Sequence, residues 1–325
     1  MADSTFHTGR HRQTTAELDA AEQEWWERNW DLEERYCWVQ TRGVQRLLRS
    51  AYTRRITGRL TRDDVVVELG SGTGWLSDLM RRRAGTVIGI DPSPSQISRS
   101  QQDPDEQAPR AGTDFRVGSY ESLSEVPPPS VIVAHAVLHH LSSAEIDDCL
   151  RGCAAALSPG GRLVLFEPVA APASPNASRS YSAQRRLEDL PHSFAARGWR
   201  RLSAEESALR RRLSDRPAQP LPFGPSPKET PLVRGELESH LHRHGFSVEC
   251  MRPYLVMSHL VAQEMLIAET SQPRFWKLAK WPILAASVVL DQTMIRSGRL
   301  PAGAWVFTLF ECQLVAGSVE VPRAG

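Results

Sequence analysis

Three glycines spaced two apart, with an acidic residue on each side of them, form the motif best suited to hold a ligand. The glycines are Gly70, Gly72 and Gly74. They follow the apolar run 65–69, in which the fourth residue is Glu68, and Asp91 ends the next apolar run, 86–91. Glycine has no β-carbon, so the backbone of such a turn can lie directly against a ligand. An acid at the end of the following strand accepts hydrogen bonds from ribose hydroxyls in doubly wound sheets.

The spacing of the glycines distinguishes this motif from dinucleotide sites. Dinucleotide-binding folds carry G-x-G-x-x-G, in which a helix N-terminus holds the pyrophosphate. This chain has G-x-G-x-G, and Glu68 at the end of the strand would repel a phosphate. The motif therefore favours a ligand with a cationic or amino-acid portion over one with a diphosphate.

Three histidines after the fourth apolar run are candidate general bases. They are His135, His139 and His140. The unperturbed pKa of histidine lies near neutrality, so any one of them could take a proton from a phenol, a carboxylic acid or an amine. His135 and His139 are four residues apart, and with Glu167 they offer metal binding as an alternative. We expect no metal at this site, and we expect Glu167 to contact the substrate.

Around these residues, apolar runs alternate with helical segments along the chain, which predicts an α/β fold with a doubly wound sheet. The β-branched run 65–69 is typical of a buried parallel strand, and the helical segment 75–80 follows the glycines directly. Towards the C-terminus, residues 235–244 have the pattern of a helix that ends at Gly245. Strands are then expected at 246–254 and 305–315.

Five motifs in the same order resemble the class I S-adenosylmethionine-dependent methyltransferases, in particular the type-11 enzymes that act on small molecules. The motifs are the glycine turn, Asp91, residues 114–120, residues 130–141 and residues 157–168. The resemblance is good over residues 60–168 and weaker over 233–254 and 305–316. It implies a Rossmann-like sheet of seven strands, the last one antiparallel, and S-adenosylmethionine as the cofactor.

The resemblance also implies roles for individual residues. The implied cofactor contacts are Glu68, Gly70, Ser71, Gly72, Gly74, Asp91, Ser119, Tyr120 and His135. Ser119 stands where many relatives carry an acid towards the adenine amine, and Tyr120 beside it could form a hydrogen bond or stack instead. The histidine at the His140 position is common in the family without a catalytic role, so the choice of base among the three histidines stays open.

Four segments are expected along the chain. They are an N-terminal helical extension (1–60), the cofactor-binding core (61–168), a helical lid insertion (169–232) and the C-terminal part of the core with an inserted helical segment (233–325). Dense aromatics make Trp30 and Tyr36 candidates for the acceptor pocket, with packing of the helix onto the sheet as the alternative. The apolar run 281–290 is shorter than the ~20 residues that span a bilayer. We expect it in a buried helix, with dimer or membrane-surface contact as the alternative.

Composition agrees with a soluble enzyme. The formal net charge is +1, from 39 basic and 38 acidic residues, so no overall field attracts nucleic acid or a membrane. The five cysteines are scattered, and the N-terminus is polar without an apolar signal core, which favours the cytoplasm. The expected partner is a small-molecule acceptor, and a homodimer is an alternative to a monomer.

Other reactions remain open within the same fold. Such a chain could use S-adenosylmethionine for a cyclisation or for aminocarboxypropyl transfer, or could bind it without catalysis. A nucleic-acid methyltransferase of exocyclic amines is disfavoured, because that class places Asn/Asp-Pro-Pro-aromatic after the fourth strand. Here the sequence at that place is Ala134-His135-Ala136-Val137.

Overall fold

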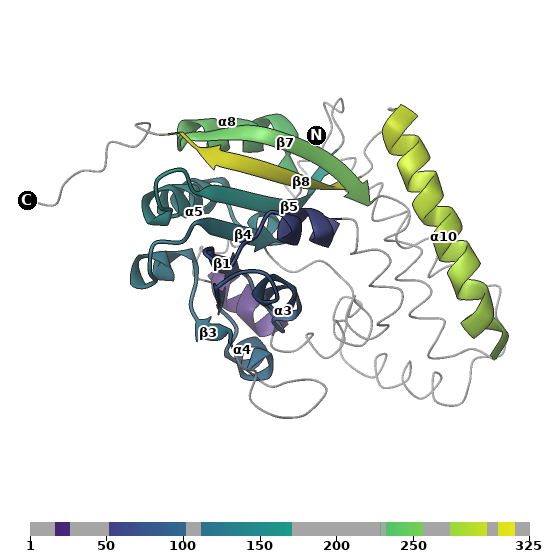
Figure 1. The fold of residues 1–325 in the computed structure, drawn as a ribbon, viewed down its shortest axis with the longest axis horizontal. Coiled ribbons are helices and arrows are strands. Elements are labelled where there is room, and N and C mark those ends of the chain that lie inside the picture. The colour runs from purple at the N-terminus through teal and green to yellow at the C-terminus, as the bar shows by residue number, and fades with distance from the viewer. Residues whose placement is uncertain are drawn as a thin grey trace, which may run out of the picture.

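The computed structural model describes residues 17–26, 52–101, 112–170, 228, 232–255, 274–297 and 305–315. Within these residues one eight-stranded sheet has the order β3-β2-β1-β4-β5-β8-β7, with β6 beside β5 (Figure 1). The strands are β1 (Val65–Leu69), β2 (Thr86–Asp91), β3 (Asp114–Val117), β4 (Val131–His135), β5 (Arg162–Ala170), β6 (Leu232–Val233), β7 (Phe246–Leu255) and β8 (Trp305–Leu314). The predicted doubly wound α/β fold is confirmed.

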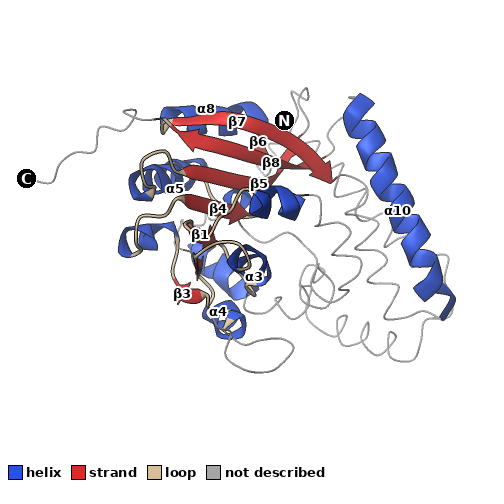
Figure 2. Cartoon of the chain, in the orientation of Figure 1, coloured by secondary structure: helices blue, strands red, loops and turns tan. Residues whose placement is uncertain are grey.

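Helices cover both faces of the sheet (Figure 2). They are α3 (Trp75–Arg81), α4 (Pro94–Ser100), α5 (Ser143–Ala156), α8 (Arg234–Arg243), α10 (Arg274–Ser297) and two helices at residues 17–26 and 52–58, with the 3-10 turns η1 (Tyr120–Glu125) and η2 (Leu138–His140). Alternate residues of a strand face opposite sides. Val67 and Leu69 therefore join the apolar cluster under α5 and α8, whereas Val66 joins the cluster under helix 52–58 and α3.

The first five strands are parallel, and the far edge of the sheet reverses direction. β1 pairs with β2 and β4, and β4 pairs with β5, all in parallel. β8 is antiparallel to both β5 and β7, as expected for the last strand. The predicted number of seven strands needs one correction, because the two residues of β6 add a short parallel pairing at the end of β5. A pairing of two residues has too little sequence pattern to be predicted.

One expectation about α10 is wrong. The run 281–290 is helical, but Ile283, Val289 and Leu290 are 40%, 65% and 49% exposed. The buried residues of this helix include the polar Ser287 and Asp291. Part of the apolar run therefore faces outward, whereas Val288 packs against the cluster under helix 52–58 and α3. Among the described helices, none has the length and apolar character to cross a membrane.

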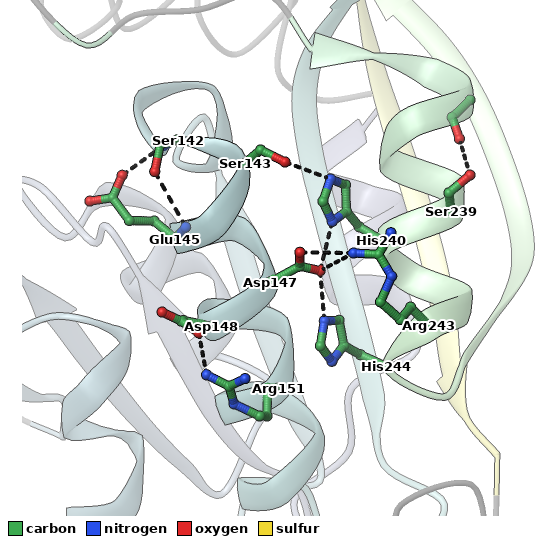
Figure 3. Close-up of polar contacts among 11 residues, drawn as sticks. Ser142, Ser143, Glu145, Asp147, Asp148, Arg151, Ser239, His240, Arg243 and His244 are labelled. Carbon is green, nitrogen blue, oxygen red and sulfur yellow. Dashed lines mark hydrogen bonds and ion pairs between the residues drawn. The ribbon is translucent and has the colours of Figure 1, made fainter.

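A polar cluster joins α5 to α8 on one face of the sheet (Figure 3). Asp147 of α5 accepts hydrogen bonds from Nη1 of Arg243, at 2.8 and 2.9 Å. Oδ1 of Asp147 also lies 2.7 Å from Nδ1 of His240 and 2.8 Å from Nε2 of His244. One carboxylate thus holds a whole turn of the neighbouring helix.

Candidate functional site

The glycine turn between β1 and α3 has the left-handed backbone that its sequence predicts. The φ angles of Gly70, Gly72 and Gly74 are 65°, 51° and 76°. A β-carbon at Gly70 would lie 2.4 Å from Cγ2 of Val137, so this glycine permits close packing against the turn after β4. A β-carbon at Gly72 would meet no atom within 4 Å, so open space lies over this backbone. The turn therefore combines one tightly packed position with one that leaves room for a ligand.

Asp91, at the end of β2, fixes the glycine turn from the side. Its Oδ2 accepts a hydrogen bond from the backbone N–H of Gly72 at 2.9 Å, and its Oδ1 accepts one from Ser93 at 2.9 Å. The residue is 8% exposed. A carboxylate has about four lone-pair directions, so Asp91 can accept hydrogen bonds from ribose hydroxyls as well as from the backbone.

Ser71 supplies the observation that tests whether the site fits a cofactor. The residue is buried, and its Oγ has no hydrogen-bond partner among the described residues. Buried hydroxyls are usually paired, so an unpaired one beside open space at Gly72 fits a site that receives a polar ligand. The glycine turn, Ser71 and Asp91 are therefore the residues that would hold the ribose and methionine portions of S-adenosylmethionine.

Glu68 lies below this turn. It is 2% exposed and accepts a short hydrogen bond from the Ser77 hydroxyl of α3. Burial raises the pKa of Glu68 to about 8, and the bond from Ser77 acts in the opposite direction. The side chain thus ties β1 to α3 beneath the backbone that would face the cofactor.

The turn after β4 is organised by Glu167 of β5. Oε1 of Glu167 accepts hydrogen bonds from the backbone N–H groups of Val137 and Leu138, at 2.8 and 2.9 Å. Ala136 in the same turn has a φ of 58°, which is uncommon for a residue with a β-carbon. Glu167 is fully buried, and burial raises its pKa to about 7, against the effect of the backbone donors. The structure therefore places Glu167 inside the turn, with its carboxylate engaged by the chain itself.

His139 belongs to the same buried group. Its Nδ1 lies 2.9 Å from Oε2 of Glu167, and the residue is 6% exposed. Burial lowers the pKa of His139 to about 3, although the charge of Glu22 opposes this shift. At neutral pH the ring is therefore neutral, and one hydrogen bond links its Nδ1 to Oε2 of Glu167. His139 positions the turn rather than presenting its ring to solvent.

His135, at the end of β4, lies among aromatic rings. Its ring stacks on Phe166, with centroids 5.0 Å apart, and meets Trp75 edge-on at 5.2 Å. Nε2 of His135 lies 3.3 Å from the Tyr52 hydroxyl, and Tyr52 is fully buried. Since Trp75 directly follows Gly74, these contacts connect His135 to the glycine turn.

His140 faces the N-terminal helix (residues 17–26). Its Nδ1 lies 3.0 Å from Oε1 of Glu22, and its ring meets Trp26 edge-on at 5.4 Å. The ring is also 4.0 Å from that of His139. The three predicted histidines thus share one turn but have different surroundings: aromatic for His135, buried and carboxylate-bound for His139, and covered by a helix for His140.

The third motif lies at the end of β3. Ser119 caps η1 by accepting a hydrogen bond from the backbone N–H of Glu121 at 3.2 Å. Tyr120 is half-buried against the apolar cluster under α5, and burial raises the pKa of its hydroxyl. The peptide N–H of Gly118 donates to the carbonyl of Asp91 at 3.0 Å, which brings this turn beside the end of β2.

Trp30 and Tyr36 lie outside the described residues, as does most of the insertion 169–232. The residues around the histidines that the sequence did not indicate are Glu22, Tyr52, Trp75, Phe166 and Lys228. Only Trp75 had a usable signal, its position after the third glycine. The described residues contain no group of three metal-ligating side chains in a suitable arrangement.

Comparisons with known proteins agree with this geometry. Residues 18–216, more than half of the chain, match the family described as methyltransferase domain. The ubiquinone biosynthesis O-methyltransferase of Bradyrhizobium diazoefficiens is 29% identical over 100 residues, which are 31% of this chain and 38% of the relative. The acetylserotonin O-methyltransferase of Mus musculus is 29% identical over 149 residues, which are 45% of this chain and 37% of the relative. The matched region thus spans less than two fifths of these relatives' own length.

Solved structures share the fold. A mycolic acid cyclopropane synthase complexed with SAH and CTAB superposes with a TM-score of 0.56 at 14% identity, covering 90% of this chain and 97% of that chain. A geranyl diphosphate C-methyltransferase from Streptomyces coelicolor A3(2) gives a TM-score of 0.50 at 14% identity, covering 83% and 81%. The chain therefore belongs to the methyltransferase family, with the class I S-adenosylmethionine-dependent fold that its motifs predicted.

Proposed function

We propose that this protein transfers the methyl group of S-adenosylmethionine to an O, N or C atom of a small-molecule acceptor. The observation that carries the proposal is the open space over Gly72, bordered by the buried, unpaired hydroxyl of Ser71 and by Asp91. The family to which the chain belongs supports the same cofactor. The bound cofactor would supply an electrophilic methyl group on a positively charged sulfur.

The chain's own task in such a reaction is alignment and exclusion of water, because methyl transfer is an in-line displacement. The glycine turn would bind the methionine and ribose portions of the cofactor, with Glu68 buried beneath the turn. Ser119 and Tyr120 would lie beside the adenine. His135, beside Trp75, would border the reacting end. Trp25 and Trp26 of the N-terminal helix, which make an edge-on pair 4.9 Å apart, would cover the turn after β4 from solvent.

The nature of the acceptor is part of this proposal. The net charge of +1 offers no strong field for a polyanion, which favours a small molecule over nucleic acid. The O-methyltransferases that match part of the chain support the same class. We propose that the protein acts in the cytoplasm and that Trp30 and Tyr36 contact the acceptor. Glu167, buried and bonded to the turn after β4, would support the pocket from behind.

Calorimetry with S-adenosylmethionine and S-adenosylhomocysteine tests the cofactor site. Gly72→Val would place a branched side chain in the open space, and Asp91→Ala would remove the acceptor of the ribose hydroxyls and of the Gly72 N–H. Each substitution should weaken binding at least ~100-fold, which is about 2.7 kcal/mol. Gly160→Val, at another glycine with a positive φ (73°), whose β-carbon would meet only Gln313 at 3.9 Å, is the matched control.

Unchanged affinity in both site variants, with both chains folded, would contradict the cofactor site. Product analysis then tests the reaction itself: S-adenosylhomocysteine together with an acceptor that is heavier by one methylene supports methyl transfer. Cyclised product with intact cofactor, or release of methylthioadenosine, would instead assign one of the alternative reactions.

A further inference from the structure

The contact between Glu22 and His140 joins the N-terminal helix to the turn after β4. Oε1 of Glu22 lies 3.0 Å from Nδ1 of His140, and the two side chains are 12% and 17% exposed. The residues are far apart in sequence and belong to separate elements. Their pairing is therefore a product of tertiary structure rather than of local geometry.

The other bonds of Glu22 define its protonation state. Oε1 also accepts a hydrogen bond from Nε1 of Trp26 at 2.8 Å, and Oε2 accepts one from the backbone N–H of Lys228 at 2.9 Å. Both donors can only donate, so the carboxylate is fixed as an acceptor on each oxygen. A carboxyl group that accepts at both oxygens is stabilised in its ionised form.

This fixes the tautomer of His140. An ionised carboxylate can only accept, so Nδ1 of His140 must carry the proton that lies between them. In the neutral ring the lone pair is then on Nε2. Glu22 therefore holds the imidazole in the orientation and tautomer in which Nε2 is the basic atom, the arrangement by which a carboxylate supports a histidine base.

The charges around His140 favour a proton on its ring. Lys228 binds Asp19 of the N-terminal helix at 2.5 Å and Glu145 of α5 at 2.6 Å. Together with Glu22 these give three carboxylates around one lysine. Glu167 of β5 lies behind the neutral His139 and interacts with the charge of His140. Among the described residues these charges sum to a negative value, which would stabilise an imidazolium formed on His140.

We propose that Glu22 is the positioning residue of a Glu22–His140 dyad that deprotonates a phenolic hydroxyl of the acceptor. The inference rests on the proposed methyl transfer and names the acceptor class. As the acceptor oxygen bonds to the methyl carbon, the carbon–sulfur bond breaks and its electron pair stays on sulfur. The hydroxyl proton passes to Nε2 of His140, and from there to solvent after the product leaves.

The acceptor class follows from the match between base and acid. A phenol with a pKa of about 10 keeps its proton at neutral pH and can lose it to an imidazole as its oxygen is methylated. Trp26, edge-on to the His140 ring, and Trp25 beside it provide an apolar surface suited to an aromatic ring.

The first test reads the tautomer directly, without any acceptor. In ¹⁵N-histidine-labelled protein, the two ring nitrogens of His140 should report Nδ1–H in the wild type, assigned by comparison with His140→Gln. Glu22→Gln should raise the Nε2–H fraction, and Glu22→Asp should restore part of the Nδ1–H form. Glu24→Gln, an exposed acid on the same helix, is the matched control. An unchanged tautomer in Glu22→Gln would overturn the dyad.

The second test separates positioning from a merely structural role. With 2-naphthol as acceptor, Glu22→Gln should lower kcat ~10- to 100-fold and shift the acid limb of the pH profile, while cofactor affinity stays within about twofold. With 4-nitrophenol, which is largely ionised at pH 8.5, the defect should disappear. An equal loss with both phenols would contradict the base role.

Two outcomes distinguish this inference from the proposed function. If the wild type binds the cofactor and methylates an amine or a carbon acid, but neither phenol, the acceptor class inferred here is wrong and the proposed function stands. If the cofactor does not bind, the proposed function itself fails, and the tautomer measurement alone decides whether the dyad exists.

Discussion

Burial makes Glu68 a source of pH dependence in folding. Its carboxyl titrates near 4.5 in an unconstrained chain and near 8 in the folded protein, chiefly because burial disfavours the charged form. Between these two values the folded chain holds a proton that the unfolded chain has released. The contribution of Glu68 to the free energy of unfolding is therefore greatest below pH 4.5 and is lost as the pH rises through 8.

Glu68→Gln tests this directly. Glutamine can still accept the bond from Ser77 through its amide oxygen, but it has no proton to lose. Between pH 4.5 and 8 the wild type should therefore lose stability that the variant does not lose. The free energy of unfolding of the variant should rise relative to that of the wild type over this range. Urea titrations at a series of pH values measure it, with Glu121→Gln, an exposed acid, as the control. A difference independent of pH would show that Glu68 keeps its ordinary pKa.

At the scale of single residues, the sequence predicted positions at which the residue type itself limits the conformation or the contact. Glycines at 70, 72 and 74 have positive φ angles, and Asp91 lies against the turn. The partners of the histidines were not predictable. No local pattern distinguishes Glu22 as the residue that contacts His140, because the same helix contains other glutamates in similar sequence surroundings.

At the scale of elements, the cluster around Asp147 decides how firmly α8 is held against α5. Its carboxylate contacts three basic side chains, and the hydrogen bond to His240 is the main cause that lowers the pKa of Asp147 to about 2. The ordinary value is 3.8, so this contribution to stability is complete above pH 3.8 and is lost as the pH falls through 2.

Asp147→Asn should destabilise the protein by about 1 kcal/mol at pH 7, since a partly exposed network loses its charge but keeps part of its hydrogen bonding. Asp148→Asn is the matched control, because Asp148 pairs only at the surface with Arg151 of the same helix. Chemical denaturation of both variants measures the difference. If Asp148→Asn costs as much as Asp147→Asn, the cluster has no special role in joining the helices.

The sequence predicted the elements better than their environments. The segments expected as strands at 246–254 and 305–315 end within one residue of β7 and β8. The exposure of α10 was not predicted, because an apolar run has the same composition whether it packs inward or outward. The pairing of β6 with β5 depends on where the chain returns after the insertion, which no local pattern records.

At the scale of the whole molecule, Lys228 joins parts of the chain that are far apart in sequence. It contacts Asp19 and Glu145, which are 209 and 83 residues away. The side chain is only 11% exposed, so it is held between the N-terminal helix and the start of α5. The two segments predicted as additions to the core thus meet at one lysine beside the turn after β4.

Lys228→Ala should loosen the N-terminal helix without disturbing the glycine turn. We expect faster amide hydrogen exchange over residues 17–26, unchanged exchange over residues 65–80, and a Michaelis constant that rises about 3- to 10-fold for the acceptor but not for the cofactor. Arg151→Ala, which removes an exposed cation from α5, is the control. Equal effects on both Michaelis constants would mean that the helix supports the whole site rather than its acceptor side.

Lys228 is also one of only three lysines in the chain, the others being Lys277 and Lys280, among 39 basic residues. Arginine does not react with acylating reagents that modify amines, so Lys228 is one of few reactive amines in the chain and its modified peptide can be read separately. Its amine is shielded by two carboxylates and should react only in molecules whose N-terminal helix has separated from α5. The acylation rate of this one residue, read by mass spectrometry with and without ligands, would therefore measure how often the N-terminal helix separates from α5.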